Sequence, residues 1–242
     1  MEVSTEDLRV LKTGERLNDR IINEYLKLLQ QRGEKTKWPT VLAFNSIFLG
    51  KFLKHGYTGV ERWTKNEDIF KYDIVLIPNF VEDLRHWILV VVDFRTKEVL
   101  IRDSLSGTYN SIGAKVLEYL RVEAFHKKKR ILQSRKWGIK GKLGPKKGNK
   151  MDCGVYLCIN AEAYAADRTA TFTQRDVPWL RMTMVKELQE KRILSHQKPP
   201  PEIPGIKPAP MKKGRKKITR RPSPMFVSER TNSSVSNSRN AD

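Results

Sequence analysis

Two apolar runs separated by a short polar segment restrict the fold of this chain more than any other feature. Residues 87–92 are an unbroken run of aromatic and β-branched side chains of strand length, and residues 99–102 form a second run. The polar residues between them predict an antiparallel hairpin. In such a pair the start of one strand lies beside the end of the next, so His86 should lie near Asp103. An aspartate there can orient one imidazole nitrogen and leave the other free to take a proton.

A cysteine at the start of an apolar segment supplies the third element of a candidate catalytic site. Gly148, Asn149 and Lys150 predict a loop, whereas the residues after Cys153 are small, apolar and helix-forming. The sulfur would then lie at a helix N-terminus, where backbone N–H groups and a neighbouring imidazolium favour the thiolate. Gly154, which has no Cβ, is expected to let a substrate backbone approach.

Each of these residues also has an ordinary structural interpretation. A cysteine in an apolar helix is commonly a small core residue, and we expect this of Cys158. A histidine before a strand is weak evidence alone, and aspartate and serine are frequent in turns. The combination of His86, Asp103 and Cys153 in one predicted arrangement favours a cysteine nucleophile with a histidine base and an orienting aspartate.

The rest of the apolar pattern ends near residue 194, which predicts one domain over residues 1–194 and a tail over residues 195–242. Helices and strands around one sheet predict an α+β fold. The expected helices cover residues 19–31, 46–54, 112–125, 152–166 and 177–192, and the expected strands cover residues 74–78, 87–92 and 99–102.

Composition excludes several classes of protein. The chain has two cysteines, and neither has metal-ligand spacing, so we expect no disulfide framework, no metal site and a reducing compartment. No apolar run reaches membrane-spanning length, and the acidic N-terminal residues are unlike a signal peptide.

The net charge of +20 is concentrated in two places. One is a stretch without acidic residues between Lys127 and Lys150, which leads to Cys153 and could attract nucleic acid or steer an acidic protein surface. The other lies between Lys212 and Arg221, in a tail whose Pro, Ser and Asn content predicts disorder. This second cluster predicts a nuclear localisation signal that binds an import receptor, with a solvated charge run as the alternative.

The ordered motifs of the chain resemble the ubiquitin-like-protein-specific cysteine proteases, in particular the sentrin/SUMO-specific branch. The likeness runs from about residue 4 to residue 194. The matching motifs are Leu17-Asn18-Asp19-Arg20-Ile21-Ile22-Asn23, Ala43-Phe44-Asn45-Ser46, Gly56-Tyr57, Arg62-Trp63-Thr64-Lys65, His86-Trp87, Asp103-Ser104, Asp152-Cys153-Gly154 and Phe172-Thr173-Gln174.

The resemblance implies a papain-like fold, with a central mixed sheet, flanking helices and the catalytic residues His86, Asp103 and Cys153. It implies hydrolysis after the Gly-Gly end of a SUMO-like modifier, in precursor maturation or in release from a conjugate, without a cofactor. Trp87 would cover a tunnel that admits only glycine, since any Cβ would clash there. Trp63 and Asp19 would belong to the face that docks the modifier, although Trp63 could instead be a core aromatic.

The chain departs from the family pattern at three points. Lys147 occupies the position of the glutamine that donates to the oxyanion, and a lysine is less preorganised there than an amide. Arg16 replaces the tryptophan that opens the first signature and removes one aromatic wall of the implied glycine clamp. Residues 79–85 form a longer segment before His86 than is usual in the family, and they lack the second histidine that often lies there. The chain begins near the family's first signature, so we expect either a fragment or a short form.

Two functions from different classes follow. The first is an active deconjugating cysteine protease in the nucleus, supported by the complete set His86, Asp103 and Cys153. The second is a catalytically weakened relative that binds the modifier, and also nucleic acid, as an interaction module. Lys147, Arg16 and the basic charge favour this second function. A protein that only binds nucleic acid is poorly supported, because the matching motifs belong to a catalytic core.

Overall fold

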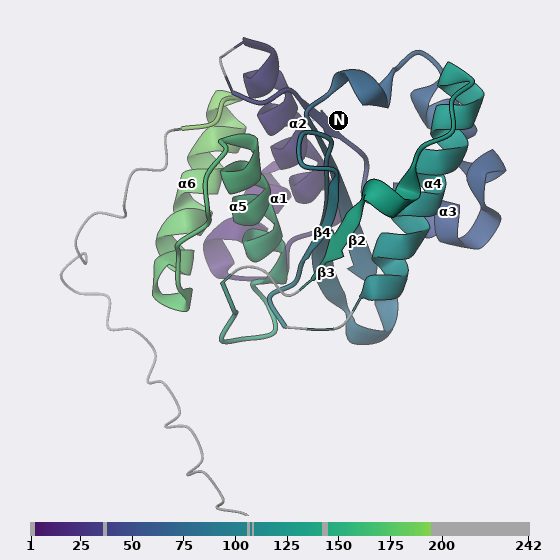
Figure 1. Cartoon of the computed structure of the whole chain (residues 1–242). Helices are drawn as coiled ribbons and strands as arrows, with labels where there is room; N and C mark the ends of the chain where they lie inside the picture. The colour runs from purple at the N-terminus through teal and green to yellow at the C-terminus, as the bar shows by residue number, and fades with distance from the viewer. Residues whose placement is uncertain (1–2, 36–37, 106, 108, 142–144, 195–242) are drawn as a thin grey trace, which may run out of the picture. The chain divides into compact units, whose positions relative to one another are not determined.

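The computed structural model describes residues 3–35, 38–105, 107, 109–141 and 145–194 (Figure 1). The predicted basic tail, residues 195–242, lies outside the described residues, as do Lys212 and Arg221. The helices are α1 (Thr5–Thr13), α2 (Asp19–Lys35), α3 (Phe48–His55), α4 (Asn110–Lys128), α5 (Cys153–Ala165) and α6 (Val177–Glu190), and the strands are β1 (Val41–Ala43), β2 (Ile74–Val81), β3 (His86–Asp93), β4 (Glu98–Arg102) and β5 (Gly138–Lys140). None of the helices in this described part is long and apolar enough to cross a membrane.

The five strands form one mixed sheet in the order β1-β2-β3-β4-β5, which confirms the predicted α+β class. The central pairs β2/β3 and β3/β4 are antiparallel, and the outer pairs β1/β2 and β4/β5 are parallel. The predicted hairpin is therefore present, with Asp93 opposite Glu98 and Leu89 opposite Arg102. This antiparallel register places the start of β3 beside the end of β4.

Strand β3 is apolar between its end residues His86 and Asp93, in keeping with the burial of both of its faces. Alternate side chains enter two separate cores. Leu89 and Val91 pack with residues of α2, α5 and α6, whereas Val90 and Val92 pack with residues of α3 and α4. Figure 1 shows α5 and α6 on one side of the sheet and α3 and α4 on the other.

The approach to β3 is a tight connection. Strand β2 extends to Val81, which pairs with His86, and a short 3₁₀ helix, Glu82–Leu84, fills the turn. Arg85 completes it with a φ of 45°, in the left-handed region. In the segment that the sequence marks as unusually long, residues 79–81 belong to β2 and residues 82–84 to the 3₁₀ helix, and the segment leads to His86 at the start of the central strand β3.

Helix α1 and strands β1 and β5 are absent from the sequence prediction. Helix α1 has a capping box, in which the Ser4 hydroxyl accepts from the Asp7 backbone N–H and the Asp7 carboxylate accepts from the Ser4 backbone N–H. Gly14, with a φ of 78°, ends the helix. These signals are present in the sequence. Strands β1 and β5 have only three residues each, which is too short for a detectable period.

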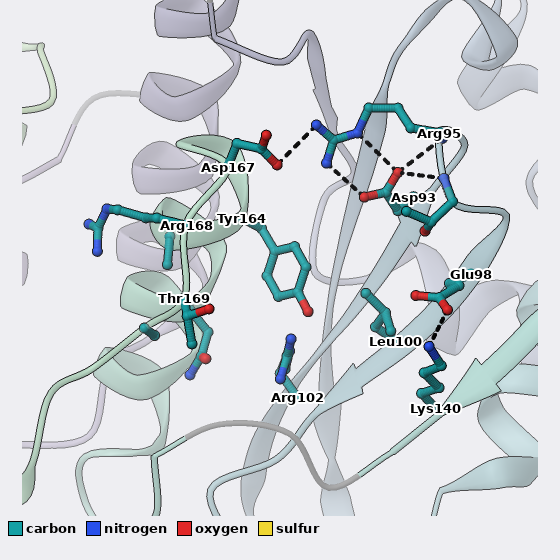
Figure 2. A pocket seen from close by; sticks show the side chains of 14 residues that line it. Asp93, Arg95, Glu98, Leu100, Arg102, Lys140, Tyr164, Asp167, Arg168 and Thr169 are labelled. Atoms are coloured by element: carbon teal, nitrogen blue, oxygen red, sulfur yellow. Dashed lines mark hydrogen bonds and ion pairs between the residues drawn. The ribbon is translucent and has the colours of Figure 1, made fainter.

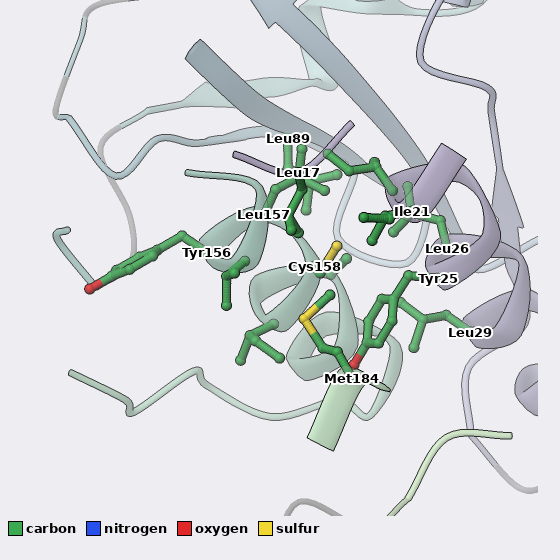
Figure 3. Packing of buried hydrophobic residues seen from close by; sticks show 14 of the residues in the cluster. Leu17, Ile21, Tyr25, Leu26, Leu29, Leu89, Tyr156, Leu157, Cys158 and Met184 are labelled. Carbon is green, nitrogen blue, oxygen red and sulfur yellow. The ribbon is translucent and has the colours of Figure 1, made fainter. Parts of the chain in front are cut away.

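Helix α5 is buried almost all round, as expected for a helix with so little polar surface. Figure 3 shows Cys158 inside this core, surrounded by residues that include Ile21, Tyr25 and Met184, so its predicted role as a core residue is confirmed. The expectation for Gly154 is wrong. A Cβ on Gly154 would lie 2.8 Å from the Cβ of Leu17, so the missing side chain lets the segment before α2 pack on α5.

Candidate active site

The end of the β3/β4 hairpin holds a buried histidine and carboxylate. His86 is the first residue of β3, Asp103 directly follows β4, and Nε2 of the imidazole lies 2.5 Å from Oδ1 of the carboxylate. Asp103 also accepts hydrogen bonds from the backbone N–H groups of Leu105 and Gly107, at 2.9 and 2.5 Å. Burial opposes the negative charge, but these three hydrogen bonds outweigh it and lower the pKa of Asp103.

The third member of the site, Cys153, is the first residue of α5 and is buried. Burial disfavours its thiolate, yet interactions with the His86 ring, the Trp87 backbone N–H and the Lys147 charge lower the pKa of the Cys153 thiol. Because Asp103 holds Nε2 of the ring, Nδ1 is the nitrogen available to the sulfur.

The charge state of His86 follows from the same contacts. Burial lowers the pKa of the imidazole, but the hydrogen bonds to Asp103 and Cys153 raise it further than burial and the Lys147 charge lower it. The net pKa of His86 is raised, while that of Cys153 is lowered. Both shifts act in the direction of an imidazolium beside a thiolate, the reactive form of such a pair.

Lys147 lies inside this site. Its Nζ is 3.2 Å from Nδ1 of His86, and its backbone N–H donates to the Ser104 carbonyl oxygen at 3.3 Å. Burial lowers the pKa of the lysine, and the nearby Arg16 charge lowers it further, against the attraction of the Cys153 thiolate. The ammonium therefore lies at Nδ1, the same ring nitrogen that is available to the thiol, and both groups can act on it.

Hydrogen bonds fix the loop that carries Lys147. The Tyr156 hydroxyl donates to the Lys146 carbonyl oxygen at 3.0 Å, and the Gly148 backbone N–H donates to Oε1 of Gln174 at 2.7 Å. The amide nitrogen of Gln174 in turn donates to Oδ2 of Asp152 at 2.7 Å. One glutamine thus connects the lysine loop to the residue directly before the nucleophile.

A buried arginine on α6 completes the support of the nucleophile. Nη2 and Nε of Arg181 donate to Oδ1 of Asp152 at 2.6 and 3.0 Å. The same guanidinium donates to the carbonyl oxygens of Val10, Leu11 and Glu15 at the end of α1, at 3.3, 3.4 and 2.9 Å. Both side chains of the ion pair are 5% exposed, so this contact joins α1, α6 and the start of α5 in a dry interior.

Sequence reasoning missed Arg181 and the role of Gln174 as a bridge. The one available signal was the position of the arginine: Arg181 lies next to Leu180 and three residues before Met184 on the buried face of its helix. A charged residue on such a face needs a buried partner. Nothing in the sequence identifies Asp152, 29 residues away, as that partner.

Two of the other predicted residues lie at the site. Trp87 is 3% exposed, and its indole Nε1 donates to the Leu17 carbonyl oxygen at 3.0 Å. Nη2 of Arg16 donates to the Lys150 carbonyl oxygen at 3.2 Å, in the loop before the nucleophile. Through these hydrogen bonds, the Trp87 side chain fixes the backbone at Leu17, and the Arg16 side chain fixes the backbone of the loop before Cys153.

The structure does not bring the remaining two predicted residues into contact with this group. Asp19 is exposed at the first residue of α2. Trp63 packs against the core that contains α3 and α4, where its ring centroid is 5.4 Å from that of Phe48. Within the described residues, no cluster of three side chains is suited to hold a metal ion.

The arrangement of Cys153, His86 and Asp103 can carry out nucleophilic acyl substitution. The sulfur can attack a carbonyl carbon, the imidazole can transfer a proton at Nδ1, and the carboxylate fixes the ring at Nε2. This chemistry needs no group beyond the side chains present.

The paired pKa shifts predict how the Cys153 thiol titrates. A lowered pKa means that the thiolate persists below the pH of about 8.5 at which an ordinary thiol ionises. The ultraviolet absorbance of the thiolate, taken as the difference from Cys153→Ser, should therefore appear at a lower pH than the absorbance of an ordinary thiol. Cys158 does not contribute at that pH, because burial and then the Glu187 charge raise its pKa.

His86→Ala supplies the control for this titration. Without the imidazole, less of the opposing effect of burial is offset, so the midpoint of the Cys153 titration should move to higher pH than in the wild-type chain. An unchanged midpoint in His86→Ala would show that the ring does not stabilise the thiolate.

The Arg181–Asp152 pair generates a stability prediction. Arg181→Met leaves a buried carboxylate without its cation, and we expect the free energy of unfolding to fall by about 3–5 kcal/mol. Adding Asp152→Asn should recover part of this loss, since a neutral amide needs no counter-charge. Urea unfolding measures both, with the exposed Arg175→Met as the matched control. A double variant no more stable than Arg181→Met alone would show that the bonds to α1, and not the ion pair, stabilise the fold.

Comparison with known proteins agrees with this geometry. The model of the Ulp1 protease family, C-terminal catalytic domain, matches residues 15–195. A sentrin-specific protease of Caenorhabditis elegans is 35% identical over 197 residues, covering 81% of this chain and 28% of that protein. Sentrin-specific protease 2 of Mus musculus is 34% identical, covering 80% and 33%. The chain thus spans a third or less of the length of these curated relatives.

Solved structures show the same fold. The C-terminal protease domain of Ulp1, solved in complex with Smt3, the yeast ortholog of SUMO, has a TM-score of 0.69 and 27% identity, and the match covers 78% of this chain and 83% of that one. A structure of the SUMO protease Ulp1 with its catalytic cysteine oxidised to a sulfinic acid has the same TM-score and identity, covering 78% and 85%. With the family match over residues 15–195, this chain belongs to the Ulp1 protease family.

Proposed function

We propose that this chain is a cysteine peptidase that cleaves after the C-terminal Gly-Gly of a SUMO-like modifier, in conjugates or in the modifier precursor. The observation that carries this proposal is the buried group of Cys153, His86 and Asp103. Its electrostatics favour the thiolate, the reactive form of the thiol. The relatives named above as sentrin-specific proteases, and the Ulp1 domain solved with Smt3, support this substrate class.

The proposed reaction has two steps. The Cys153 thiolate attacks the carbonyl carbon of the terminal glycine, and the His86 imidazolium donates the Nδ1 proton to the leaving amine as the C–N bond breaks. Water then attacks the thioester while His86 takes its proton. The modifier leaves as a carboxylate, and the cysteine is regenerated. Asp103 stabilises the charged ring during both transfers.

Lys147 is proposed as a donor to the oxyanion, together with the Cys153 backbone N–H at the start of α5. Its Nζ lies beside His86, so the side chain must turn from Nδ1 toward the oxyanion when the proton occupies that nitrogen. A lysine is a flexible donor, and loss of one oxyanion donor costs about 10²–10³ in kcat. The chain would then be slower than a relative with a preorganised amide.

The residues around the site have proposed roles in substrate binding. Trp87 is proposed to line the glycine tunnel, and Arg16 to form part of its wall. Asp19 is exposed and available to a docked modifier. The packing of Trp63 against Phe48 favours its alternative role as a core aromatic.

A second candidate function is a weakened relative that binds the modifier, and also nucleic acid, with little turnover. The position of Lys147 favours it, since an ammonium at Nδ1 competes with the thiol for the base. The basic residues between Lys127 and Lys150 supply the charge that nucleic acid would require.

A covalent trap separates the two functions. Purified chain is mixed with a SUMO-like modifier that carries a thiol-reactive group at its C-terminus, and intact mass is measured. The peptidase predicts an adduct that Cys153→Ala abolishes. In a parallel turnover assay with a SUMO precursor, Lys147→Gln should preserve or raise kcat, because it restores an amide donor. Binding without an adduct would refute the peptidase and favour the second function.

For the tail we propose nuclear import. Residues 1–194 would form the catalytic domain, and the basic cluster between Lys212 and Arg221 would bind an import receptor. Deletion of residues 195–242 should shift the protein from nucleus to cytoplasm, as seen by fluorescence microscopy of a tagged chain, and leave peptide cleavage intact. An unchanged distribution would refute the import role.

A further inference from the structure

A pocket separate from the candidate active site lies between β4 and the C-terminal end of α5 (Figure 2). Its volume is about 510 Å³, and its walls include Leu100, Arg102, Ala163 and Tyr164. Tyr164 follows Cys153 by eleven residues, which is about 16 Å along the helix. The pocket therefore lies at the other end of α5 from the nucleophile.

Arg102 occupies this pocket because of its place in the strand. Leu100 packs in the core that contains α5, whereas Val99 and Ile101 pack in the opposite core, so alternation directs Arg102 toward α5. Its guanidinium carbon lies 4.5 Å from the centroid of the Tyr164 ring. This cation–π contact fixes the guanidinium but supplies no hydrogen-bond acceptor.

The guanidinium of Arg102 has no hydrogen-bond or ion-pair partner among residues 3–194 as far as the structure describes them, and its Nε is buried. Burial without a compensating carboxylate lowers the pKa of Arg102 to about 10, so the group is still a cation at neutral pH. A buried donor without an acceptor is costly, and native proteins seldom retain one without a ligand, water or ion to satisfy it.

Each of the other cations that line the pocket has a carboxylate partner. Figure 2 shows two of these pairings, from Arg95 and from Lys140. The ion pairs are Arg95 with Asp93 and Asp167, Lys140 with Glu98, and Arg168 with Glu162. Among the four cations that line this concave site, Arg102 is the one for which the described residues supply no carboxylate.

We propose that this pocket binds a small oxyanion, a carboxylate or a phosphate, with Arg102 as its cationic anchor. The hydroxyl groups of Tyr164 and Thr169 line the same pocket and can donate further hydrogen bonds. Leu100 and Ala163 supply apolar walls for a short organic body. The site is independent of peptide cleavage, since none of these residues belongs to the group around Cys153.

The test measures binding of inorganic phosphate and of glutarate to the full chain by isothermal titration calorimetry, with sodium chloride added to hold ionic strength constant. The two probes distinguish phosphate from carboxylate as the anion. We expect saturable binding of at least one of them, weakened about tenfold or more in Arg102→Gln through loss of a charge-assisted hydrogen bond. Arg121→Gln, which removes an exposed arginine on α4, should bind as the wild type does. No saturable binding, or equal binding by all three proteins, would overturn the proposal.

Two further measurements guard against a folding artefact. Arg102→Lys keeps the charge and should retain more affinity than Arg102→Gln, and the melting temperature of each variant without anion reports whether it folds. In the wild-type chain, the arginine Nε–H signal assigned to Arg102 by heteronuclear NMR should shift as the anion is added. An unmoved Arg102 signal at saturating anion would also overturn the proposal.

Discussion

The burial of β3 on both faces is the constraint on which the rest of the structure depends. Because one set of its side chains faces α5 and the other faces α3 and α4, a shift of one residue would exchange the two cores. The register with β4 is therefore fixed, and so is the position of His86 relative to Asp103. The distance of 2.5 Å between imidazole and carboxylate follows from apolar packing that extends far from the site.

The same constraint explains which parts of the structure could be predicted from the sequence. The hairpin has a strong local pattern, and Cys153 begins a segment whose composition changes from loop to helix, so both were predictable. The contact of Arg181 with Asp152 has no local pattern, because it depends on how α6 packs against α1 and α5. Strands β1 and β5 are stabilised by backbone pairing with β2 and β4, and this pairing cannot be predicted from their own three residues. Gly154 was misread because the partner that needs its missing Cβ is Leu17, far away in the sequence.

The charge of Lys147 influences the protonation of both His86 and Cys153. The ammonium within 3.2 Å of Nδ1 lowers the pKa of both neighbours: it stabilises the Cys153 thiolate and disfavours the imidazolium. These effects act in opposite directions on the reactive ion pair. The hydrogen bonds of the ring to Asp103 and to Cys153 offset the second effect, and the net pKa of His86 is raised. The hydrogen bonds that Asp103 accepts from Leu105 and Gly107 hold the carboxylate in place at Nε2.

Two arginines that face the helix layer around α5, the buried Arg181 and the partly buried Arg102, have different partners. Arg181 has a carboxylate and three backbone carbonyl oxygens, so its charge is neutralised and nearly all of its donors are used. Arg102 is partly buried against α5 with an aromatic ring as its contact. Desolvation acts on both, and only the first has partners within the described chain that offset it. An apolar side chain at this position would fill the same space without the cost of burying a charge. The presence of the Arg102 cation beside the pocket, without a carboxylate partner, is therefore explained most simply by an anion from outside the chain.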